Sequence, residues 1–398
     1  MTSIRALLLL LLIVACAGSP DAAPAFVTRD SAGITIAENV MADVTSRCTV
    51  DSVPVVRIGG DQDSDDDFLY RVMGTSRLSD GRIAVVNQGT QEVRWYDSTG
   101  VLVGRAGRAG RGPGEFTDAF LMVRMPGDTL WVGDYRPWQW HIFGPDMTFV
   151  RSVVTTPSEI NSPDIYAVFD DGQQVFGTSR IGQRVSWAMD SVTIKRFTPD
   201  GILRDTVVSV PTGRLGQTAG EGSVWMRPWF EGAAQAEGSG DRLAVATWGE
   251  PELVIYHVGD QVTPSLIIRW TTADRTVTDS AVTAAREKLA NQYPDLSAEM
   301  KAQMVDPLIS AKRPVAERYP AVTRIVMGTD GRIWVRGYAP SEATTREWIA
   351  FSREGRAVCR AELPEVDYLY EIGRDYLLTH ERDSLGVERV VEYRLRGV

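Results

Sequence analysis

The chain has 398 residues, of which 43% are hydrophobic and 24% are charged, and its formal net charge is -10. This length allows a large buried core, in one repeat-built domain or in two ordinary domains. The acidic balance excludes the basic surface that neutralises a nucleic-acid backbone, so we expect no nucleic-acid partner.

The N-terminal residues have the layout of an export signal. Arg5 gives one positive charge, an apolar run follows it, and small residues follow the run. Residues 13–16 read Ile-Val-Ala-Cys and resemble the bacterial lipobox, in which the cysteine is lipidated and becomes the new N-terminus. We therefore predict a lipoprotein signal peptide over residues 1–16, a lipid anchor on Cys16 and a linker over 17–30. The alternative is an ordinary signal cut near Ala23, which discards Cys16.

The residue after this cysteine bears on the choice of membrane. It is Ala17, and not the aspartate that in some bacteria retains lipoproteins at the inner membrane. We therefore expect an exported lipoprotein in the outer membrane, facing the periplasm or the cell surface.

An acidic run from Asp61 to Asp67 precedes the first repeat. Its alternating oxygen ligands are spaced as in a calcium loop. However, Asp66 stands where an EF-hand needs glycine, and Val72 stands where it needs glutamate. A solvated acidic loop is the favoured interpretation.

From residue 79 onward, one unit of a turn and a short apolar strand recurs six times. The copies are SDGRIAVVN, PGDTLWVGD, DDGQQVFGT, GSGDRLAVAT, TDGRIWVRG and IGRDYLLTH. A second strand follows each copy and ends in an aromatic residue: Tyr96, Phe143, Phe197, Tyr256, Phe351 and Tyr393. Short strands between Asp-Gly and Pro-Asp turns, with little helix, predict antiparallel all-β structure. The unit length fits four strands, so we predict a six-bladed β-propeller over residues 31–398.

The stretch GRAGRAGRGPGEF, residues 104–116, is rich in glycine and arginine. It matches no phosphate-binding motif, since it has no G-x-x-x-x-G-K-[ST] and no G-x-G-x-x-G ahead of a helix. We interpret it as the connection between two blades, in which glycines permit positive φ and Phe116 enters the core. Arg105, Arg108 and Arg111 would then give this surface a preference for anionic ligands.

Two further segments combine arginine with tryptophan. DYRPWQW contains Arg136 and Trp138, and WMRPWF contains Arg227 and Trp229. Core packing explains aromatic residues in general, but arginine beside tryptophan in a loop is also typical of binding surfaces. We take these four residues as candidates for ligand or partner binding.

Residues 274–318 predict a helical insertion between the fourth and fifth blades. Val282, Ala285 and Leu289 fall on one helical face, with Thr278 or Asp279 as the cap. We expect Pro294 to end this helix, and a second helix over 296–305 to present Met300 and Met304.

The last unit ends after three strands, so its outer strand must come from elsewhere. Two strand-like segments, GITIAENV and VPVVRIGG, lie before the first repeat, and we expect one of them to close the ring. Cys48 and Cys359 would then come near each other. A disulfide between them and two free buried thiols are both open interpretations.

These motifs together resemble a known group. SDGRIAVVN, the YDSTG turn, GRAGRGPGEF, DGRIWVR and ERVVEYRL are similar to the NHL-repeat, TolB-like six-bladed propellers that occur as exported bacterial lipoproteins. The resemblance covers about residues 30 to 398. It implies the fold and little about function, because such scaffolds have many uses.

Enzymatic chemistry has few candidates in the sequence. His141, His257 and His380 lie in different units with no ligand-like spacing, which argues against the histidine-rich metal site of the lyase relatives of this fold. Ester-hydrolysing relatives place calcium in the central channel, and Asn87 and Asp134 are weak candidates for such a site. There is no G-x-S-x-G elbow, and we predict no other cofactor.

The inter-blade connections, the aromatic loop and the helical insertion are expected on one face of the propeller. We therefore expect a monomeric, non-catalytic cell-envelope lipoprotein, a scaffold that binds an envelope protein or a small-molecule ligand on this loop face. The alternative is a metal-dependent hydrolase or lyase acting at the central channel.

Overall fold

The protein is described here from a computed structural model. The described residues are 25–60, 64–135, 138–155, 164–179, 187–218, 225–340, 343–364, 366 and 368–397. The predicted signal peptide with Cys16, and also Arg136, lie outside these residues. Of the helices in the described part of the chain, none is long and apolar enough to cross a membrane.

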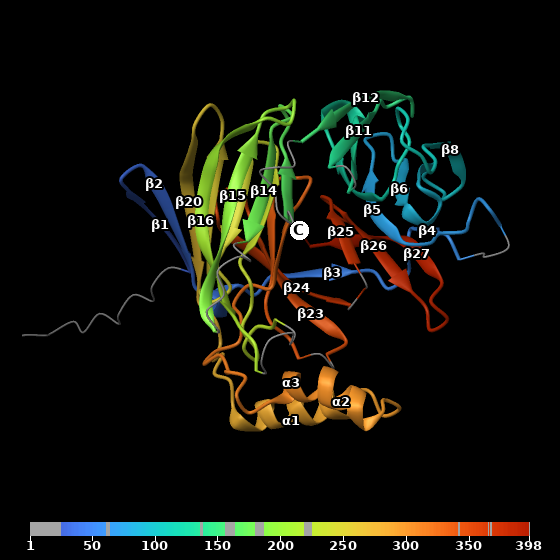
Figure 1. Ribbon diagram of the computed structural model, residues 1–398. Coiled ribbons are helices and arrows are strands. Elements are labelled where there is room, and N and C mark those ends of the chain that lie inside the picture. The colour runs from blue at the N-terminus through green and yellow to red at the C-terminus, as the bar shows by residue number, and fades with distance from the viewer. Residues whose placement is uncertain are drawn as a thin grey trace, which may run out of the picture.

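Strands dominate the structure and follow one another in antiparallel runs of four, which we call arrays (Figure 1). The first three arrays are separate sheets. Their strands are β5 (Val72–Arg77), β6 (Ile83–Asn87), β7 (Glu92–Tyr96) and β8 (Leu102–Ala106); β9 (Ala119–Arg124), β10 (Leu130–Asp134), β11 (Gln139–Phe143) and β12 (Phe149–Val154); and β13 (Asp164–Val168), β14 (Gln174–Ser179), β15 (Ala188–Phe197) and β16 (Leu203–Leu215).

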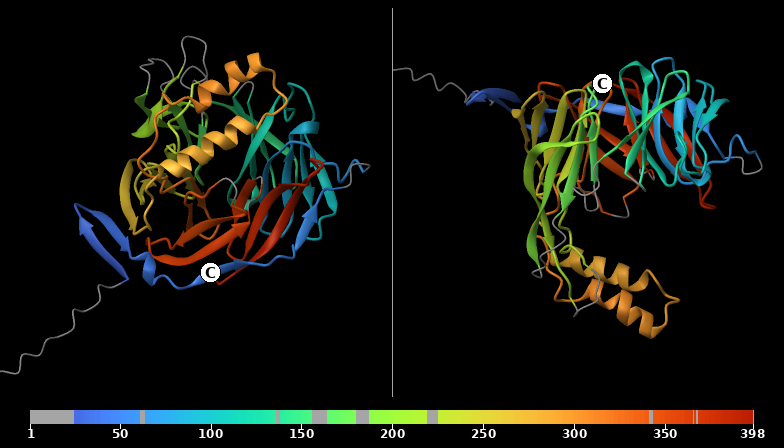
Figure 2. Two further views of the ribbon diagram at one scale, coloured as in Figure 1. Left: turned by 90° about the horizontal axis from the view of Figure 1, so that it is seen from below. Right: turned by 45° about the horizontal axis from the view of Figure 1, so that its top comes forward.

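The later strands continue this pattern within two larger sheets. Their strands are β17 (Gln235–Ser239), β18 (Arg242–Ala246), β19 (Glu252–Val258) and β20 (Val262–Trp270); β21 (Arg324–Met327), β22 (Ile333–Arg336), β23 (Thr345–Phe351) and β24 (Ala357–Pro364); and β25 (Tyr368–Ile372), β26 (Tyr376–Arg382) and β27 (Glu388–Arg396). The arrays stand around a central axis, which Figure 2 shows in its left view. This arrangement is a β-propeller, as the repeats predict.

The repeat motifs build the core between the arrays. The second strands β6, β10 and β18 are buried along their whole length, because they have packed neighbours on both faces. Of the aromatic residues that end the third strands, Tyr96, Phe143, Phe197 and Phe351 are fully buried. The other two, Tyr256 and Tyr393, are half-buried.

The glycine-rich stretch connects β8 to β9, as predicted. Phe116 is fully buried, in a cluster with the ring of Phe143. Gly107 has a φ of 88°, and a Cβ atom there would come within 2.6 Å of the Phe116 ring. A side chain at this position is therefore excluded both by the backbone conformation and by the space.

The N-terminal segment runs along the outside of the ring and joins its ends (Figure 2, left). Its strands are β1 (Phe26–Ser31), β2 (Ile34–Asn39), β3 (Arg47–Val50) and β4 (Val56–Ile58). β2 adds in parallel to β20, β3 pairs with both β24 and β27, and β4 pairs antiparallel with β27. The segment VPVVRIGG thus supplies the outer strand of the last array.

The first strand begins within the predicted linker over residues 17–30. β1 begins at Phe26 and pairs with β2 through its whole length. The reason is local: residues 32 and 33 form a tight turn, in which Ala32 and Gly33 both have positive φ, and the chain folds back into a hairpin.

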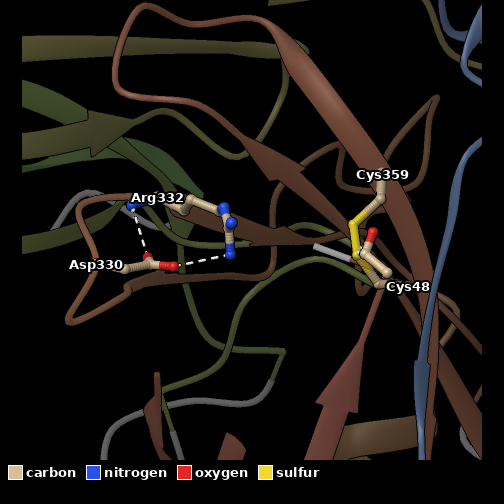
Figure 3. Close-up of a disulfide and its surroundings, with 5 residues drawn as sticks. Cys48, Asp330, Arg332 and Cys359 are labelled. Carbon is tan, nitrogen blue, oxygen red and sulfur yellow. Dashed lines mark hydrogen bonds and ion pairs between the residues drawn. A yellow bond between two sulfur atoms is a disulfide. The ribbon is translucent and has the colours of Figure 1, made fainter. Parts of the chain in front are cut away.

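A disulfide joins Cys48 on β3 to Cys359 on β24, over a sequence separation of 311 residues. Figure 3 shows it, together with Asp330 and Arg332 of the turn between β21 and β22. Both cysteines are buried. The covalent link holds the N-terminal segment against a strand from the C-terminal part of the chain.

Three helices lie in the chain between β20 and β21: α1 (Asp279–Asn291), α2 (Ala298–Met304) and α3 (Asp306–Ile309). Thr278 caps α1 by accepting from the Ala281 N–H, and Ser297 caps α2 in the same way. Met300 and Met304 are exposed, as predicted, whereas α3 was not predicted. The helices project from one face of the ring (Figures 1 and 2), which we call the helix side.

Candidate ligand-binding channel

A cavity of about 1080 Å³ runs through the centre of the propeller. The first strand of every array contributes to its wall, namely β5, β9, β13, β17, β21 and β25. β9 and β17 are half-buried along most of their length, because one side of each faces the cavity, whereas most residues of β5 and β21 are buried. The volume lies at the upper end of the range for sites that take small molecules and cofactors.

Neighbouring first strands run parallel and lie close together. Gly238 on β17 shows this: a Cβ atom there would come within 2.7 Å of the Ala167 Cβ on β13. Each of these strands follows a connection between arrays, and the helices form one such connection, ending at Arg324, the first residue of β21. Residues early in these strands therefore lie toward the helix side, and residues late in them lie toward the opposite end.

At the opposite end, Asp128 holds two arrays together. Its carboxylate accepts from the backbone N–H of Ser79 at 3.1 Å and from the Ser79 hydroxyl at 2.5 Å. Arg124 donates to the same carboxylate at 3.3 Å. Asp128 is 9% exposed, so this charge is nearly buried and fully paired.

Glu371 on β25 makes a second closed network at this end. One oxygen accepts from the Ser76 hydroxyl at 2.5 Å, and the other accepts from the Tyr376 hydroxyl and the Arg77 N–H. The Arg77 guanidinium lies over the Tyr376 ring at 4.6 Å and pairs with Glu392 at 3.5 Å. Burial, and then the negative charge of Glu371, raise the pKa of Tyr376, which stays a neutral donor.

The remaining charges near this end are mostly paired as well. Asp330 pairs with Arg332 at 2.7 Å (Figure 3), and Asp241 pairs with Arg353 at 3.3 Å. Arg242 is the exception, because its Nη1 is buried with no hydrogen-bond partner among the described residues. Burial and the charge of Arg353 lower the pKa of Arg242, while Asp241 acts in the opposite direction.

Glu237 on β17 is bonded differently from Glu371, although the two residues occupy equivalent positions in the first strands of their arrays and so lie at the same level of the channel. Its Oε1 accepts from the Met327 N–H at 3.0 Å, and within the described part of the chain its Oε2 has no partner. Burial raises the pKa of Glu237 to about 7, although the Met327 N–H and the charge of Arg324 act to lower it. This carboxyl group therefore changes protonation state near neutral pH.

Arg324 on β21 is the cation whose charge acts to lower the pKa of this carboxyl group. Its guanidinium lies over the Tyr368 ring at 4.4 Å, and its Nη2 donates to the Leu369 carbonyl at 2.5 Å. Its Nε and Nη1 have no partner among the residues that the structure describes, and the two charges do not form an ion pair there. Arg324 and Glu237 thus carry unused hydrogen-bonding atoms in the same cavity wall.

Aromatic rings surround these two groups. Tyr368 lines the cavity and is 47% exposed, and its ring lies 4.5 Å from that of Tyr370. Tyr370 donates to the Val72 carbonyl at 2.8 Å, so it is fixed. Phe120 and Tyr166 line the cavity from β9 and β13. Burial raises the pKa of Tyr166, and its hydroxyl has no hydrogen-bond partner among the described residues.

His380 also lines the cavity, but it is already engaged. Its Nε2 lies 3.1 Å from Glu388, and that carboxylate also accepts from the Val72 N–H at 2.8 Å. Both residues are buried. This pair therefore joins β26 and β27 to β5, and it is part of the wall rather than of the free groups.

Of the three arginines predicted for anion binding, Arg105 lies on β8, the outermost strand of its array, and Arg108 and Arg111 lie on the connector beyond it. Arg105 pairs with Asp66, and Arg108 pairs with Glu115. Arg111 is exposed. The structure does not bring these residues to the central cavity.

The predicted arginine–tryptophan pairs fall into two groups. Trp138 packs against Phe120 and Phe176 in the cluster between the second and third arrays, and its partner Arg136 lies outside the described residues. Trp229 is 8% exposed, its backbone N–H donates to the Pro314 carbonyl, and Arg313 lies 4.2 Å above its ring. Arg227 donates to the Thr212 carbonyl.

These contacts indicate a structural role for Trp229. It holds the segment after α3 against the propeller, which explains a buried tryptophan next to a loop. Burial lowers the pKa of Arg313 to about 10. The guanidinium lies over the Trp229 ring in a cation–π contact.

The two weak calcium candidates are occupied by local hydrogen bonds. Asn87 accepts from the Tyr70 N–H at 2.8 Å and donates to Thr90 at 3.0 Å. Asp134 accepts from the backbone N–H groups of Thr117 and Asp118. Burial acts to raise the pKa of Asp134, but these bonds and His141 lower it. Neither residue lines the channel, and the described residues contain no cluster of three or more His, Cys, Asp or Glu that could hold a metal.

Sequence reasoning did not find Glu237, Arg324 or Tyr368. Each lies in a first strand, and these strands carry no shared motif. One signal was present in the sequence. Glu237 directly precedes the fourth repeat and lies between small residues in a short half-buried strand, where a glutamate is uncommon.

No protein-family model matches the chain, and no curated protein sequence matches it. Among solved structures, a protein assigned as exported from Bacteroides fragilis NCTC 9343 aligns with a TM-score of 0.51 at 10% identity, over 91% of this chain and 98% of that one. A DUF4221-family member from Bacteroides vulgatus ATCC 8482 gives a TM-score of 0.47 at 10% identity, over 89% and 99%.

The PQQ-bound aldose sugar dehydrogenase of Streptomyces coelicolor aligns with a TM-score of 0.40 at 13% identity, over 89% of this chain and 100% of that one. At such identities a likeness concerns the fold alone. Only the first of these three alignments exceeds a TM-score of 0.5, and it supports the overall architecture described above.

Proposed function

We propose that this protein is a non-catalytic binding protein of the cell envelope that takes a small polar ligand into its central channel. The observation that carries this proposal is the contrast within one cavity wall. Asp128 and Glu371 are fully paired, whereas Glu237 and Arg324 have unused hydrogen-bonding atoms. Both residues are half-buried in the channel wall, so these atoms are open to a ligand.

The export of the protein is part of this proposal. The N-terminal layout and the lipobox at Cys16 support a lipid-anchored form, and the first solved structure above is assigned as exported. The Cys48–Cys359 disulfide fits an oxidising compartment. The choice of Ala17 after the cysteine supports the outer membrane.

The number of blades and the place of the helices between them are also part of this proposal. Six arrays, the last completed by β4, correspond to the six blades of an NHL-like or TolB-like propeller. The three helices are then an insertion between the fourth and fifth blades. The exposed arginines of the β8–β9 connector remain candidates for a protein partner on the helix side.

Native mass spectrometry of the full-length protein, purified from membranes without denaturation, tests the proposal. We expect a small molecule to copurify with the protein and to dissociate on activation. Ala236→Trp and Ser239→Trp, which fill the channel from β17, should reduce its occupancy, and folding of both variants is checked by circular dichroism. Ser98→Trp, in an exposed turn, is the control.

The proposal fails if no small molecule copurifies, or if the two channel variants retain it as fully as the control does. A stoichiometric metal with hydrolase or lyase activity would favour the enzyme instead.

A further inference from the structure

Three arginines occupy the same position of the repeat, at the end of the turn between the first and second strands. They are Arg82, Arg242 and Arg332, and each directly precedes a fully buried apolar residue of the second strand. In the first and fifth arrays the turn reads Asp-Gly-Arg, so an aspartate stands two residues before the arginine. In the fourth array the turn reads Gly-Asp-Arg, and Gly240 stands at this place.

The aspartates of the Asp-Gly-Arg turns hold their arginines. Asp80 accepts from the Arg82 N–H at 3.0 Å and from its Nε at 2.7 Å. Asp330 accepts from the Arg332 N–H at 3.1 Å and lies 2.7 Å from its Nη1 (Figure 3). Arg82 also donates from Nη2 to the Pro145 carbonyl of the next array at 3.0 Å. These two arginines are therefore parts of the scaffold.

Arg242 has no such partner, although it is only 9% exposed. Its Nη1 is buried, and none of its guanidinium nitrogens has a hydrogen bond or an ion pair among the residues that the structure describes. The aspartate of its own turn, Asp241, lies instead 3.3 Å from Arg353 Nη2 and 3.3 Å from His257 Nδ1. A nearly buried guanidinium without an acceptor destabilises the folded protein. Its donors are available to a ligand.

The free donors of Arg242 open on the central cavity. Arg242 lines this cavity, and so do Ser239 and Gly240 before it. Nε and Nη2 also lack a partner in the described part of the chain, but they are not fully buried as Nη1 is. Gly240 brings no side chain to this wall, and a Cβ atom there would have one neighbour within 4 Å, Asp170 Oδ2 at 3.9 Å. A ligand in the channel can therefore approach this arginine.

The geometry of the free donors defines the kind of group that they bind. Nε and Nη2 form one edge of the planar guanidinium, and two parallel N–H donors on such an edge match the paired oxygens of a carboxylate or a phosphate. The acids of the neighbouring turns do not occupy this edge. Asp241 is paired with Arg353, and Glu354 is exposed and accepts from the Ser352 hydroxyl at 2.8 Å.

We infer that the ligand of the channel is a small anion, and that two oxygens of its carboxylate or phosphate group bind Nε and Nη2 of Arg242. This inference rests on the proposed function and adds the chemical class of the ligand. The binding is non-covalent. It supplies the acceptor that the Gly-Asp-Arg turn does not supply.

Thermal denaturation with two probes, inorganic phosphate and acetate, tests the inference. The full-length protein is stripped of copurified ligand by dialysis, and sodium chloride keeps the ionic strength constant. At least one probe should raise the Tm by about 1–3 °C and saturate, and the effective probe shows whether the site takes a phosphate or a carboxylate. Phosphate also stabilises proteins through exclusion from their surface, so variants are needed to assign the shift.

Arg242→Gln should abolish the saturable shift. Without probe, its Tm should equal or exceed that of the wild type, because an unpaired and nearly buried charge is removed. Arg82→Gln is the matched control, since it changes the arginine at the same position of the first array. It loses the bonds to Asp80 and to the Pro145 carbonyl, so its Tm should fall by about 1–3 °C while the probe shift remains. In native mass spectra the copurified molecule should be an anion that only Arg242→Gln loses.

Several results would overturn the inference. One is the absence of a saturable shift with both probes, and another is an equal shift in the wild type and Arg242→Gln. A Tm of Arg242→Gln as low as that of Arg82→Gln would make Arg242 a structural residue. If the copurified molecule is neutral or cationic, or an anion that Arg242→Gln retains, the inference is wrong and the proposed function stands. If nothing copurifies and no probe acts through Arg242, both are wrong.

Discussion

Glu371 on β25 and Glu237 on β17 lie at the same level of the central channel, but they are bonded differently. Glu371, like Asp128, accepts hydrogen bonds from three donors. Glu237 accepts one. The first group of carboxylates joins neighbouring arrays, whereas Glu237 has an oxygen left for something else.

This difference separates stability from binding within one cavity. A carboxylate that satisfies donors from two arrays contributes to folding, and its loss leaves those donors buried and unpaired. A carboxylate with a raised pKa destabilises the folded protein when it is ionised. This cost is tolerated where binding of a ligand offsets it. We expect substitutions of Asp128 and Glu371 to lower the free energy of unfolding, and substitutions of the groups with unused atoms to change ligand occupancy.

The largest effect is expected at Asp128. Asp128→Ala leaves the Ser79 N–H, the Ser79 hydroxyl and Arg124 without their acceptor, and places alanine at a φ of 59°. The free energy of unfolding should fall by about 2–4 kcal/mol. Urea denaturation followed by tryptophan fluorescence measures it.

Asp128→Asn is the matched control, because asparagine keeps an acceptor and tolerates positive φ. It should lose less than half as much stability. Equal losses in the two variants would show that the charge, and not the hydrogen bonds, holds this end together.

A smaller effect is expected at Glu371. Glu371→Gln retains one acceptor oxygen, so either Ser76 or Tyr376 loses its partner. We expect a loss of about 1–2 kcal/mol in the free energy of unfolding, with no change in ligand occupancy. A loss of bound ligand in this variant would show that Glu371 takes part in the binding site.

These networks show how far the sequence alone leads. The turn-and-strand repeat predicts the arrays, the connector with the buried Phe116 and a closing strand in one of two N-terminal segments, because each of these depends on local patterns. Ser76 and Glu371 meet although they are 295 residues apart, and Glu237 and Met327 meet across 90 residues.

Contacts of this kind follow from the ring geometry, and no motif marks them in the first strands. Arginine beside tryptophan in a loop is typical of a binding surface, but core packing produces the same pattern. At Trp229 it comes from a buried ring that holds the helical segment, which the sequence cannot distinguish from an exposed binding loop. Tertiary packing decides between the two.

The pH dependence of stability tests Glu237. Burial raises the pKa of Glu237 to about 7 in the folded protein, from its ordinary value of 4.5. Between these two pH values the folded state therefore binds more protons than the unfolded state. Stability from this group is therefore greatest below about pH 4.5 and falls as the pH rises through about 7. Glu237→Gln should remove this fall and stabilise the protein at pH 8 by roughly 1–3 kcal/mol, with little effect at pH 5.

Thermal denaturation at the two pH values measures this prediction, and Glu371→Gln serves as the control, because it changes a hydrogen-bonded carboxylate at the same level of the channel. A Glu237→Gln variant that is less stable than the wild type at both pH values would contradict it. Such a result would mean that the carboxylate is paired in solution, as Asp128 is.

The smallest effect on stability is expected at Arg324, and it sharpens the comparison most. Arg324→Gln removes a stacking contact with the half-exposed Tyr368 and one hydrogen bond to the Leu369 carbonyl, and it leaves no buried acid unpaired. We expect a change within about 1 kcal/mol in the free energy of unfolding. Ligand occupancy in native mass spectra should nevertheless fall, because the guanidinium Nε and Nη1 are the free donors of the site. A variant that keeps its stability and loses its ligand would show that Arg324 serves binding and not folding. A large loss of stability would instead make Arg324 a structural residue like Arg124.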